Sequence, residues 1–258
     1  MQTASRHGPD YRGRFAPSPS GPLHFGSLIT AVGSYLEAKK NRGNWLVRME
    51  DIDTPRCVPG ADADILRTLE AFGMHWDEPV LYQSHRTDAY EEALQHLHGQ
   101  NKVYPCSCTR REIADSALYG IEGAVYPGTC RKGVRPGREA RAWRVRTDLD
   151  RATISFHDAL QGYVSQNLEC QIGDFIIKRA DGVFAYQLAV VVDDAYQRIT
   201  HVVRGADLLA STPRQIHLLE LLRLPVPIYA HLPVAVPQQL ADADAGRQED
   251  RKDEGGPP

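Results

Sequence analysis

The stretch RFAPSPSGPLHFGS, residues 14–27, decides the fold. It contains three prolines and two glycines, which break regular structure, and His24 stands near its end. Residues 11–15 are typical of a short strand, and an apolar helical pattern starts at Gly26. A strand, a rigid turn and a helix in this order predict a loop at the carboxyl edge of a parallel α/β sheet.

The pattern continues with alternating helices and strands. Leu28, Val32, Tyr35 and Leu36 share one face of the first helix, which is expected to end near Gly43. A strand is predicted at 44–50, followed by a helix with Ile65, Leu69 and Phe72 on one face. Further helices are predicted over 184–196 and 211–224, the latter with Ser211 as its N-cap, and strands over 143–148, 153–158, 174–184 (with a turn at Asp181–Gly182), 200–205 and 227–236.

These elements predict one Rossmann-like α/β domain that is interrupted by an insertion and then resumed. Residues 11–103 form its first half, 104–183 the insertion and 184–236 its second half. The tail 237–258 has six acidic and three basic residues and one large apolar residue, Leu240, so we expect it to be disordered.

The bulk composition narrows the class of protein. The 258 residues carry a net charge of −3, which does not require nucleic acid as a partner. No apolar run approaches the roughly 18 residues of a membrane span, and the polar N-terminus lacks the core of a signal peptide. We therefore expect a cytoplasmic protein without a membrane partner, and a monomer.

Cys106, Cys108 and Cys130 predict a metal site, because three thiolates within 25 residues form a soft ligand set suited to zinc. The odd total of five cysteines argues against a disulfide framework, and Cys57 and Cys170 stand alone. No histidine lies between His98 and His157, so the fourth ligand is an oxygen, water or a distant group. The nearby candidates are Tyr126, Tyr119, Asp115 and Glu122.

The turn at 14–27 has the chemistry of an anion site. A helix N-terminus offers free N–H groups and positive potential to a phosphate. Gly21 and Gly26 allow close backbone approach, and His24 lies beside them. The alternative is a rigid turn with an incidental histidine.

The order of residues is more specific. RFAPSPSGPLHFGSL, 14–28, resembles the HIGH-type signature of glutamate-specific class I aminoacyl-tRNA synthetases. Three later blocks are similar to that family: VRMEDIDTPR (47–56, with Ile52 where the family has threonine), FAYQLAVVVDD (184–194) and HVVRGADLLASTPRQ (201–215). The length suits a short paralogue that keeps the catalytic domain and lacks an anticodon-binding domain. This resemblance implies activation of L-glutamate with ATP and Mg²⁺, followed by transfer to the queuosine base of tRNA(Asp).

The resemblance also implies roles for single residues. His24 is the catalytic group, stabilising phosphate charge as the adenylate forms, and Arg204 pairs with the γ-carboxylate of glutamate. Glutamate is held by Arg14, Phe15, Ala16, Pro17, Ser18, Glu50, Tyr186 and Arg204. ATP is held by Gly21, His24, Gly26, Gly205 and Asp207. Among the candidates for the fourth zinc ligand, the resemblance selects Tyr126, which completes one structural zinc site with Cys106, Cys108 and Cys130.

The sequence departs from the family after the final predicted strand. A second, lysine-containing signature is expected there, but residues 237–258 contain no serine or threonine, and Lys252 is their one lysine. We therefore expect an aberrant C-terminus, with glutamate bound but poorly activated. The alternatives are a truncated glutamyl-tRNA synthetase that charges tRNA(Glu), a non-catalytic binding protein on the same scaffold, and a nucleotidyltransferase for another small acid. Exposed arginines of the insertion, such as Arg110, Arg111, Arg131, Arg135, Arg138 and Arg141, either contact tRNA phosphates or form a solvated face.

Overall fold

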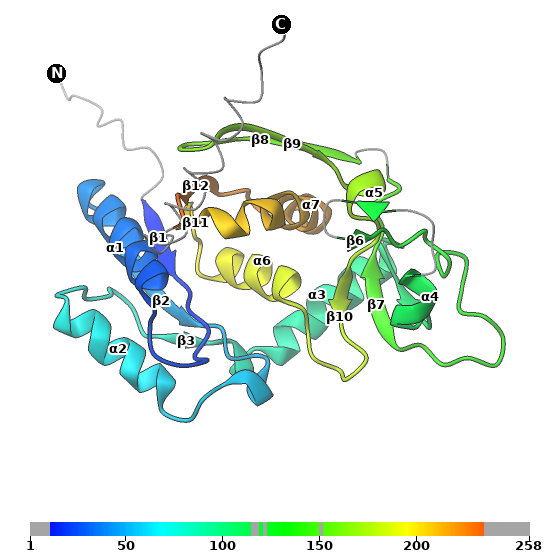
Figure 1. Cartoon of the computed structure of the whole chain (residues 1–258), viewed down its shortest axis with the longest axis horizontal. Coiled ribbons are helices and arrows are strands. Elements are labelled where there is room, and N and C mark those ends of the chain that lie inside the picture. The colour runs from blue at the N-terminus through cyan, green and yellow to red at the C-terminus, as the bar shows by residue number, and fades with distance from the viewer. Residues whose placement is uncertain (1–10, 115–118, 121–122, 150–151, 235–258) are drawn as a thin grey trace, which may run out of the picture.

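The computed structural model describes residues 11–114, 119–120, 123–149 and 152–234. Its first half alternates strands and helices: β1 (Arg12–Phe15), α1 (Phe25–Lys40), β2 (Asn44–Met49), α2 (Ala61–Ala71) and β3 (Leu81–Tyr82). Strand β2 pairs in parallel with both β1 and β3. The parallel α/β start predicted from the turn at 14–27 is confirmed (Figure 1).

The second half adds a parallel pair of strands beside the first. It comprises α6 (Tyr186–Tyr196), β11 (His201–Gly205), α7 (Thr212–Leu222) and β12 (Ile228–Leu232). Strand β11 pairs in parallel with β12. The N–H of Thr200 donates to the carbonyl of Arg12 at 3.0 Å, which joins the start of β11 to the start of β1. The carboxyl ends of β1 and β11 therefore lie side by side.

The strand β2 lies between β1 and β3 and is buried on both faces. Trp45, Val47 and Met49 lie on one face, and Leu46 and Arg48 lie on the other, and all five are at most 1% exposed, as expected for a parallel strand that is covered on both sides. Helix α1 packs on this strand through Ala31 and Ala38. The Ser34 hydroxyl on α1 accepts a 2.9 Å hydrogen bond from the Trp45 indole, which satisfies its buried N–H.

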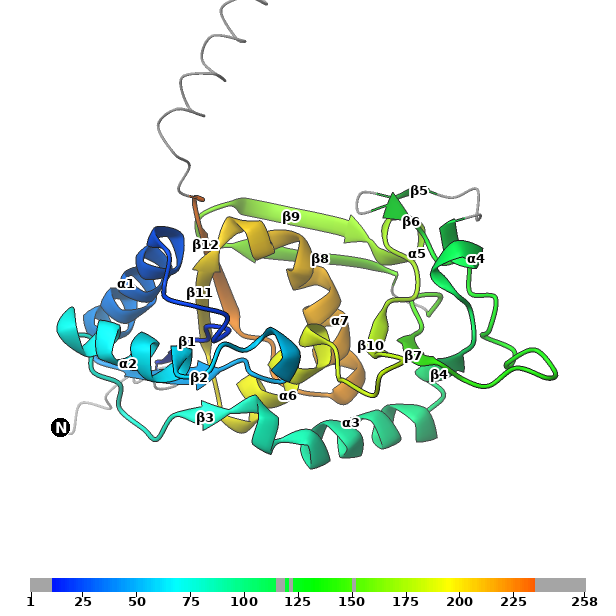
Figure 2. The same ribbon diagram turned by 60° about the horizontal axis from the view of Figure 1, so that its bottom comes forward.

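The insertion forms a separate lobe on the right of Figure 1. Its central sheet is antiparallel, with the order β10-β7-β4. A long hairpin of β8 and β9 leaves this lobe and reaches the edge of the catalytic half at β12 (Figure 2). Helix α3 (Thr87–Gly99) precedes the insertion, and short 3₁₀ turns lie outside it at Thr54–Arg56, Gln83–His85 and Ala206–Ser211. The elements of this lobe and its hairpin are β4 (Val103–Cys106), α4 (Arg110–Ala114), β5 (Tyr119–Gly120), β6 (Gly123–Ala124), β7 (Ala142–Val145), β8 (Thr153–Asp158), β9 (Gly162–Asn167), α5 (Leu168–Gln171) and β10 (Ile176–Lys178).

Some local expectations differ from the structure. Helix α3 has no counterpart among the predicted elements, although its Tyr90, Leu94 and Leu97 lie in a core cluster. Ile65 and Leu69 are buried on one face of α2, but the helix ends at Ala71, and Phe72, predicted on the same face, is 61% exposed. Ser211 occupies the N-cap of α7 but makes no capping hydrogen bond with its side chain.

Other expectations are narrowed or lie outside the structure. The strand predicted over 174–184 is shortened to β10, after which the chain turns back so that Phe184 bridges Lys178. Gly182 has φ +85° at this turn, as the Asp-Gly pair predicts. Residues 235 and 236, the tail 237–258, Asp115 and Glu122 lie outside the described residues. Within the described ranges no helix is both long and apolar enough to span a bilayer. The division at 103, 183 and 236 stays a prediction.

Candidate active site and metal-binding cluster

A cavity of about 640 Å³ lies at the carboxyl ends of β1 and β11. The structure brings all the residues predicted for glutamate and ATP to its wall. They are Arg14, Phe15, Ala16, Pro17, Ser18, Gly21, His24, Gly26, Glu50, Tyr186, Arg204, Gly205 and Asp207. The wall also includes residues that were not predicted, among them Thr30, Arg56 and Leu208. Parallel α/β sheets bind ligands at this edge, so the position fits a binding site.

The turn after β1 forms one rim of the cavity and leads into α1. His24 is the N-cap of this helix, and its Nδ1 accepts the N–H of Ser27 at 3.3 Å. Gly21 has φ +147°, a conformation that side-chain-bearing residues rarely adopt. The turn therefore presents the exposed His24 ring and the first N–H groups of α1 beside one another, which is an arrangement suited to an anion.

Buried charges lie beneath the turn. Asp194, on α6, accepts hydrogen bonds from Arg14 Nε at 3.2 Å and from Arg48 Nη1 at 2.7 Å. Burial raises the pKa of Asp194, but Arg14 and Arg48 outweigh it and the pKa is lowered overall. Asp194 is therefore an ionised anchor for the guanidinium of Arg14 at the cavity wall.

Glu50 follows β2 and is the acidic group of this network. Its Oε1 lies 3.5 Å from Arg48 Nη2 and accepts no hydrogen bond from the described residues. Burial raises the pKa of Glu50 to about 7, although Arg48 and Arg14 oppose the shift. A cation in the cavity would therefore find a buried carboxylate whose charge it could stabilise.

Arg204, at the end of β11, is buried with neutral partners. Its Nε donates to His231 at 3.0 Å and its Nη2 to the Thr212 hydroxyl at 2.7 Å. Its Nη1 makes a longer 3.3 Å contact with the hydroxyl of Tyr186. Among the residues that the structure describes, none forms an ion pair with Arg204, whose side chain lines the cavity. A buried guanidinium of this kind favours a carboxylate ligand.

Several of these contributors were not predicted as site residues. Arg48 and Asp194 stand within the quoted blocks 47–56 and 184–194, and their side chains support Arg14 and Glu50 from behind. His231 and Thr212 hold Arg204. Two signals could have indicated them: an arginine inside the otherwise apolar strand 44–49, and an acidic pair near the end of an apolar helix.

The three cysteines of the insertion converge as predicted. The sulfur atoms of Cys106, Cys108 and Cys130 lie within 4.8 Å of one another. The Tyr126 hydroxyl oxygen lies 3.4 Å from the sulfurs of both Cys106 and Cys108. Tyr119, another candidate ligand, is 74% exposed. Three thiols and a phenol thus form a compact cluster that can hold a metal ion, whereas Cys57 and Cys170 are free thiols outside it.

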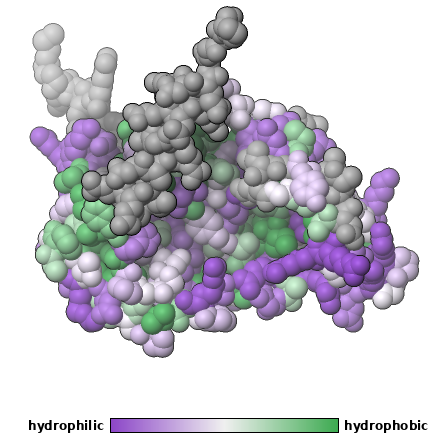
Figure 3. Space-filling model, in the orientation of Figure 1, coloured by the Kyte–Doolittle hydropathy of each residue, from purple (hydrophilic) through white to green (hydrophobic). Residues whose placement is uncertain are grey.

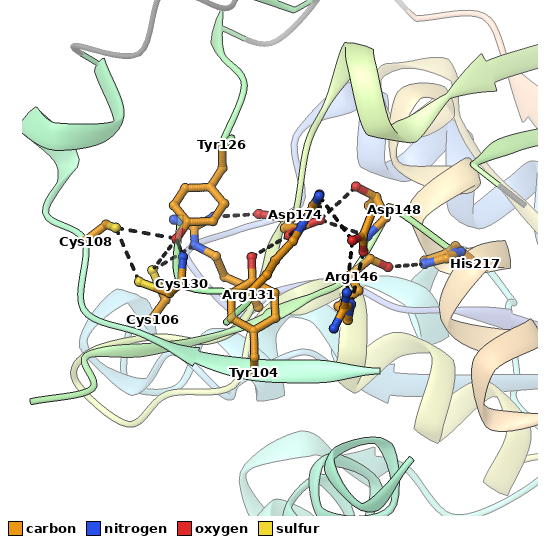
Figure 4. A network of polar contacts seen from close by, with 12 residues as sticks. Tyr104, Cys106, Cys108, Tyr126, Cys130, Arg131, Arg146, Asp148, Asp174 and His217 are labelled. Atoms are coloured by element: carbon orange, nitrogen blue, oxygen red, sulfur yellow. Dashed lines mark hydrogen bonds and ion pairs between the residues drawn. The ribbon is translucent and has the colours of Figure 1, made fainter. Parts of the chain in front are cut away.

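A buried polar network ties this cluster to the rest of the fold (Figure 4). Arg144 Nε donates to Cys106 at 3.3 Å, and its guanidinium lies 3.9 Å from the ring centroid of Tyr126. Arg131 pairs with Asp174 through two hydrogen bonds of 2.6 and 2.8 Å. Arg144 thus brings positive charge to the cluster, which suits thiolate ligands, whereas the charge of Arg131 is offset by Asp174 and Asp148.

Hydrophilic residues gather on the surface of the insertion, along the lower right of Figure 3. Glu112 on α4 pairs with Arg138 at 2.6 Å. The exposed basic residues here outnumber this carboxylate, so the surface can contact an anionic polymer. They include Arg110, Arg111, Arg135, Arg138 and Arg141, whereas Arg131 is half-buried.

Comparisons with known proteins agree with this geometry. Residues 10–240 match the family described as tRNA synthetases class I (E and Q), catalytic domain. The glutamyl-Q tRNA(Asp) synthetase of Dechloromonas aromatica is 64% identical over 227 residues, which cover 87% of this chain and 75% of that protein. The protein of that name from Cupriavidus metallidurans is 61% identical over 88% of this chain and 74% of its own length.

A solved structure shares the fold over nearly the whole chain. The glutamate tRNA ligase from Elizabethkingia meningosepticum, in complex with its amino acid, superposes with a TM-score of 0.76 at 29% identity. The match covers 92% of this chain and 53% of that one, so the chain spans about half the length of this ligase. The chain belongs to the class I tRNA synthetase (E and Q) catalytic-domain family of ligases.

Proposed function

We propose that this chain activates L-glutamate with ATP and transfers it to the queuosine base of tRNA(Asp). The names of its curated relatives, at 58–64% identity, support the reaction. The observation that carries the choice of substrate is Arg204, a buried guanidinium that lines the cavity and has only neutral partners among the described residues.

The charges at the cavity suit the two ends of glutamate. Arg204 pairs with the γ-carboxylate, and Nη1 supplies N–H groups for this contact beside the Tyr186 hydroxyl. Glu50 receives the α-ammonium group. Arg14, Ser18 and the backbone of 15–17 face the α-carboxylate end. Glutamine would leave the guanidinium of Arg204 without an anion, which explains a preference for glutamate.

The same cavity has room for ATP beside the amino acid. Gly21, His24 and Gly26, at the start of α1, hold the phosphates, and Gly205 with Asp207 lies near adenosine. An α-carboxylate oxygen of glutamate attacks the α-phosphorus in line, and pyrophosphate leaves. His24 and the N–H groups of α1 stabilise the charge that develops on the phosphate oxygens. Mg²⁺ accompanies ATP and neutralises part of the phosphate charge.

The cysteine cluster fits one structural zinc ion. Tetrahedral zinc with Zn–S bonds near 2.3 Å requires sulfurs about 3.8 Å apart, and Cys108 and Cys130 are 3.6 Å apart. The Tyr126 oxygen would be the fourth ligand, and Arg144 would offset the excess negative charge. With four protein ligands, the metal would be structural and would brace the insertion. The exposed arginines around it hold tRNA through its phosphates.

Two assays test this proposal. Glutamate-dependent exchange of labelled pyrophosphate into ATP measures activation, with glutamine and aspartate as controls. Transfer of labelled glutamate is then compared between tRNA(Asp) that contains queuosine, tRNA(Asp) that lacks it, and tRNA(Glu). We expect label only on the queuosine-containing tRNA(Asp). Equal labelling of tRNA(Glu) would contradict the proposed acceptor, and exchange driven by glutamine would contradict the role of Arg204.

A further inference from the structure

A second buried pair lies directly behind Arg204. His231, on β12, is fully buried, and its Nε2 faces the Nε–H of Arg204 at 3.0 Å. Its Nδ1 lies 2.5 Å from Oδ2 of Asp158, which is also fully buried. Asp158 ends β8 and belongs to the hairpin that reaches back from the insertion (Figure 2). The carboxylate of Asp158, the imidazole of His231 and the guanidinium of Arg204 thus form a chain of two hydrogen bonds.

The donors and acceptors in this line define one arrangement of protons. Arg204 can only donate, so Nε2 of His231 must accept and carries no proton. The proton of the neutral ring is therefore on Nδ1, where it is donated to Asp158. Burial and Arg204 lower the pKa of His231 and outweigh Asp158, which raises it, so the ring is neutral. Burial raises the pKa of Asp158, but the bond from His231 and three backbone N–H groups lower it overall, so the acid is ionised.

This arrangement fixes how the guanidinium is presented. The Nε edge of Arg204 is occupied by His231, and Nη2 donates to the Thr212 hydroxyl and, at 3.5 Å, to the carbonyl of Leu208. Thr212 Oγ1 also lies 3.1 Å from Nε2 of His231, which closes a ring of three polar groups behind the guanidinium. Only Nη1, with its 3.3 Å contact to Tyr186, retains free donor capacity beside the cavity.

We propose that Asp158 and His231 are positioning residues that fix the orientation of Arg204 and thereby set the preference of the site for a carboxylate over an amide. This inference rests on the proposed function, because it takes the γ-carboxylate of glutamate as the ligand of Arg204. Neither residue lines the cavity. Their effect passes through the His231 tautomer, which decides whether Nε2 attracts or repels the Nε–H of Arg204.

The substitution Asp158→Asn isolates this effect. Oδ1 of Asp158 accepts three backbone N–H groups, those of Leu160, Gln161 and His231, at 2.9–3.1 Å. Asparagine can keep all three through its carbonyl oxygen, so the hairpin turn is retained. Its NH₂ group then faces Nδ1 of His231, which must become an acceptor. The ring proton moves to Nε2 and opposes the Nε–H of Arg204.

Substitutions of His231 separate positioning from packing. His231→Gln can place an acceptor near the former Nε2, whereas His231→Asn keeps a donor for Asp158 and loses the acceptor for Arg204. His217→Asn is the matched control: His217 is a buried histidine on α7 that contacts the carbonyl of Arg146 and does not line the cavity. Titration calorimetry with L-glutamate, L-glutamine and ATP measures each variant without requiring turnover.

Asp158→Asn and His231→Asn should raise the Kd for glutamate about 10- to 100-fold, because a buried bond to a charged group is lost. The Kd for ATP should change less than about twofold, and the glutamate-to-glutamine preference should fall in parallel. His231→Gln should bind glutamate within about threefold of the wild type, and His217→Asn should match it. An Asp158→Asn variant that binds glutamate like the wild type, or equal losses for glutamate and ATP, would overturn the inference.

A second readout does not depend on glutamate. Nitrogen-15 NMR of the histidine rings should show His231 protonated at Nδ1 in the wild-type chain and at Nε2 in Asp158→Asn. A wild-type ring protonated at Nε2, or at both nitrogens, would contradict the inference whatever the activity. If the wild-type chain keeps the Nδ1 proton but binds no glutamate, the proposed function fails and the orientation of Arg204 by this pair stands.

Discussion

Replacing Arg204 by methionine should weaken glutamate binding at least about 100-fold without destabilising the free protein. Two hydrogen bonds of Arg204 are at most 3.0 Å long, to His231 and Thr212, and as bonds of a charged group their loss costs about 3 kcal/mol in total. Against this, a buried guanidinium without an anionic partner among the described residues carries a desolvation penalty of several kcal/mol, which methionine removes. The free energy of unfolding should therefore stay constant or rise by up to about 2 kcal/mol.

The same substitution should strongly weaken the binding of glutamate. Two charge-assisted bonds from Arg204 to the γ-carboxylate are together worth about 3 kcal/mol or more, so the Kd for glutamate should rise at least about 100-fold. Differential scanning calorimetry gives the change in stability, and titration calorimetry gives the Kd. A loss of stability of 3 kcal/mol or more (by the range for breaking a buried pair) would refute the view that Arg204 lacks an anionic partner in the free protein.

Asp194→Asn is the informative contrast, because Asp194 is the paired charge of the same region. Its removal leaves Arg14 and Arg48 without their shared carboxylate, which should cost about 3–5 kcal/mol. In a chain of this size, that corresponds to a fall in Tm of roughly 10 °C. Equal Tm values for Arg204→Met and Asp194→Asn would contradict the prediction that Asp194 is a paired charge and Arg204 an unpaired one.

Three further predictions concern Glu50, the cysteine cluster and the turn. Since burial raises the pKa of Glu50 to about 7, the Kd for glutamate should rise about tenfold from pH 8 to pH 6 as the carboxylate gains a proton, and Glu50→Gln should remove this pH dependence in calorimetric titrations. Cys130→Ser should release the proposed zinc, seen as less than one zinc per chain by elemental analysis, whereas Cys57→Ser should retain it; equal metal content would contradict the ligand set. Gly21→Ala, at φ +147°, should lower stability by about 1–3 kcal/mol in denaturant titrations, while Gly99→Ala, in the last turn of α3 with open space for a Cβ, should not.

The order of the first elements, β1, the turn at 14–27 and α1, could be predicted because their sequence signals are local. Prolines and glycines mark the turn at 14–27, and the apolar periods on either side define β1 and α1. Helix α3 was missed although the sequence carries its signal: the buried residues Tyr90, Leu94 and Leu97 have the same i, i+4, i+7 spacing that predicted α1.

From the residues alone, the candidate site could be predicted only where one short segment contributes several of its residues. Residues 14–26 converge because the turn itself brings them together. Asp194 instead meets Arg14 across 180 residues, and Asp158 meets His231 across 73 residues. No local sequence pattern predicts such distant pairs, and an acidic residue near the end of a helix is usually predicted to face solvent. Burial of polar groups is decided by the packing of elements, and it becomes visible only in the fold.

The β8–β9 hairpin limits how this protein could be recombined with its relatives. A chimera that exchanges the insertion as a cassette would keep every residue of the cavity wall between 14 and 50, yet it would also replace Asp158 beneath His231. The donor segment must therefore bring an acid at the hairpin end, in register with β12, for the exchanged protein to inherit the selectivity of the recipient. On the proposed role of Asp158, part of the specificity of the site would be encoded in the insertion, outside the segments that line the cavity.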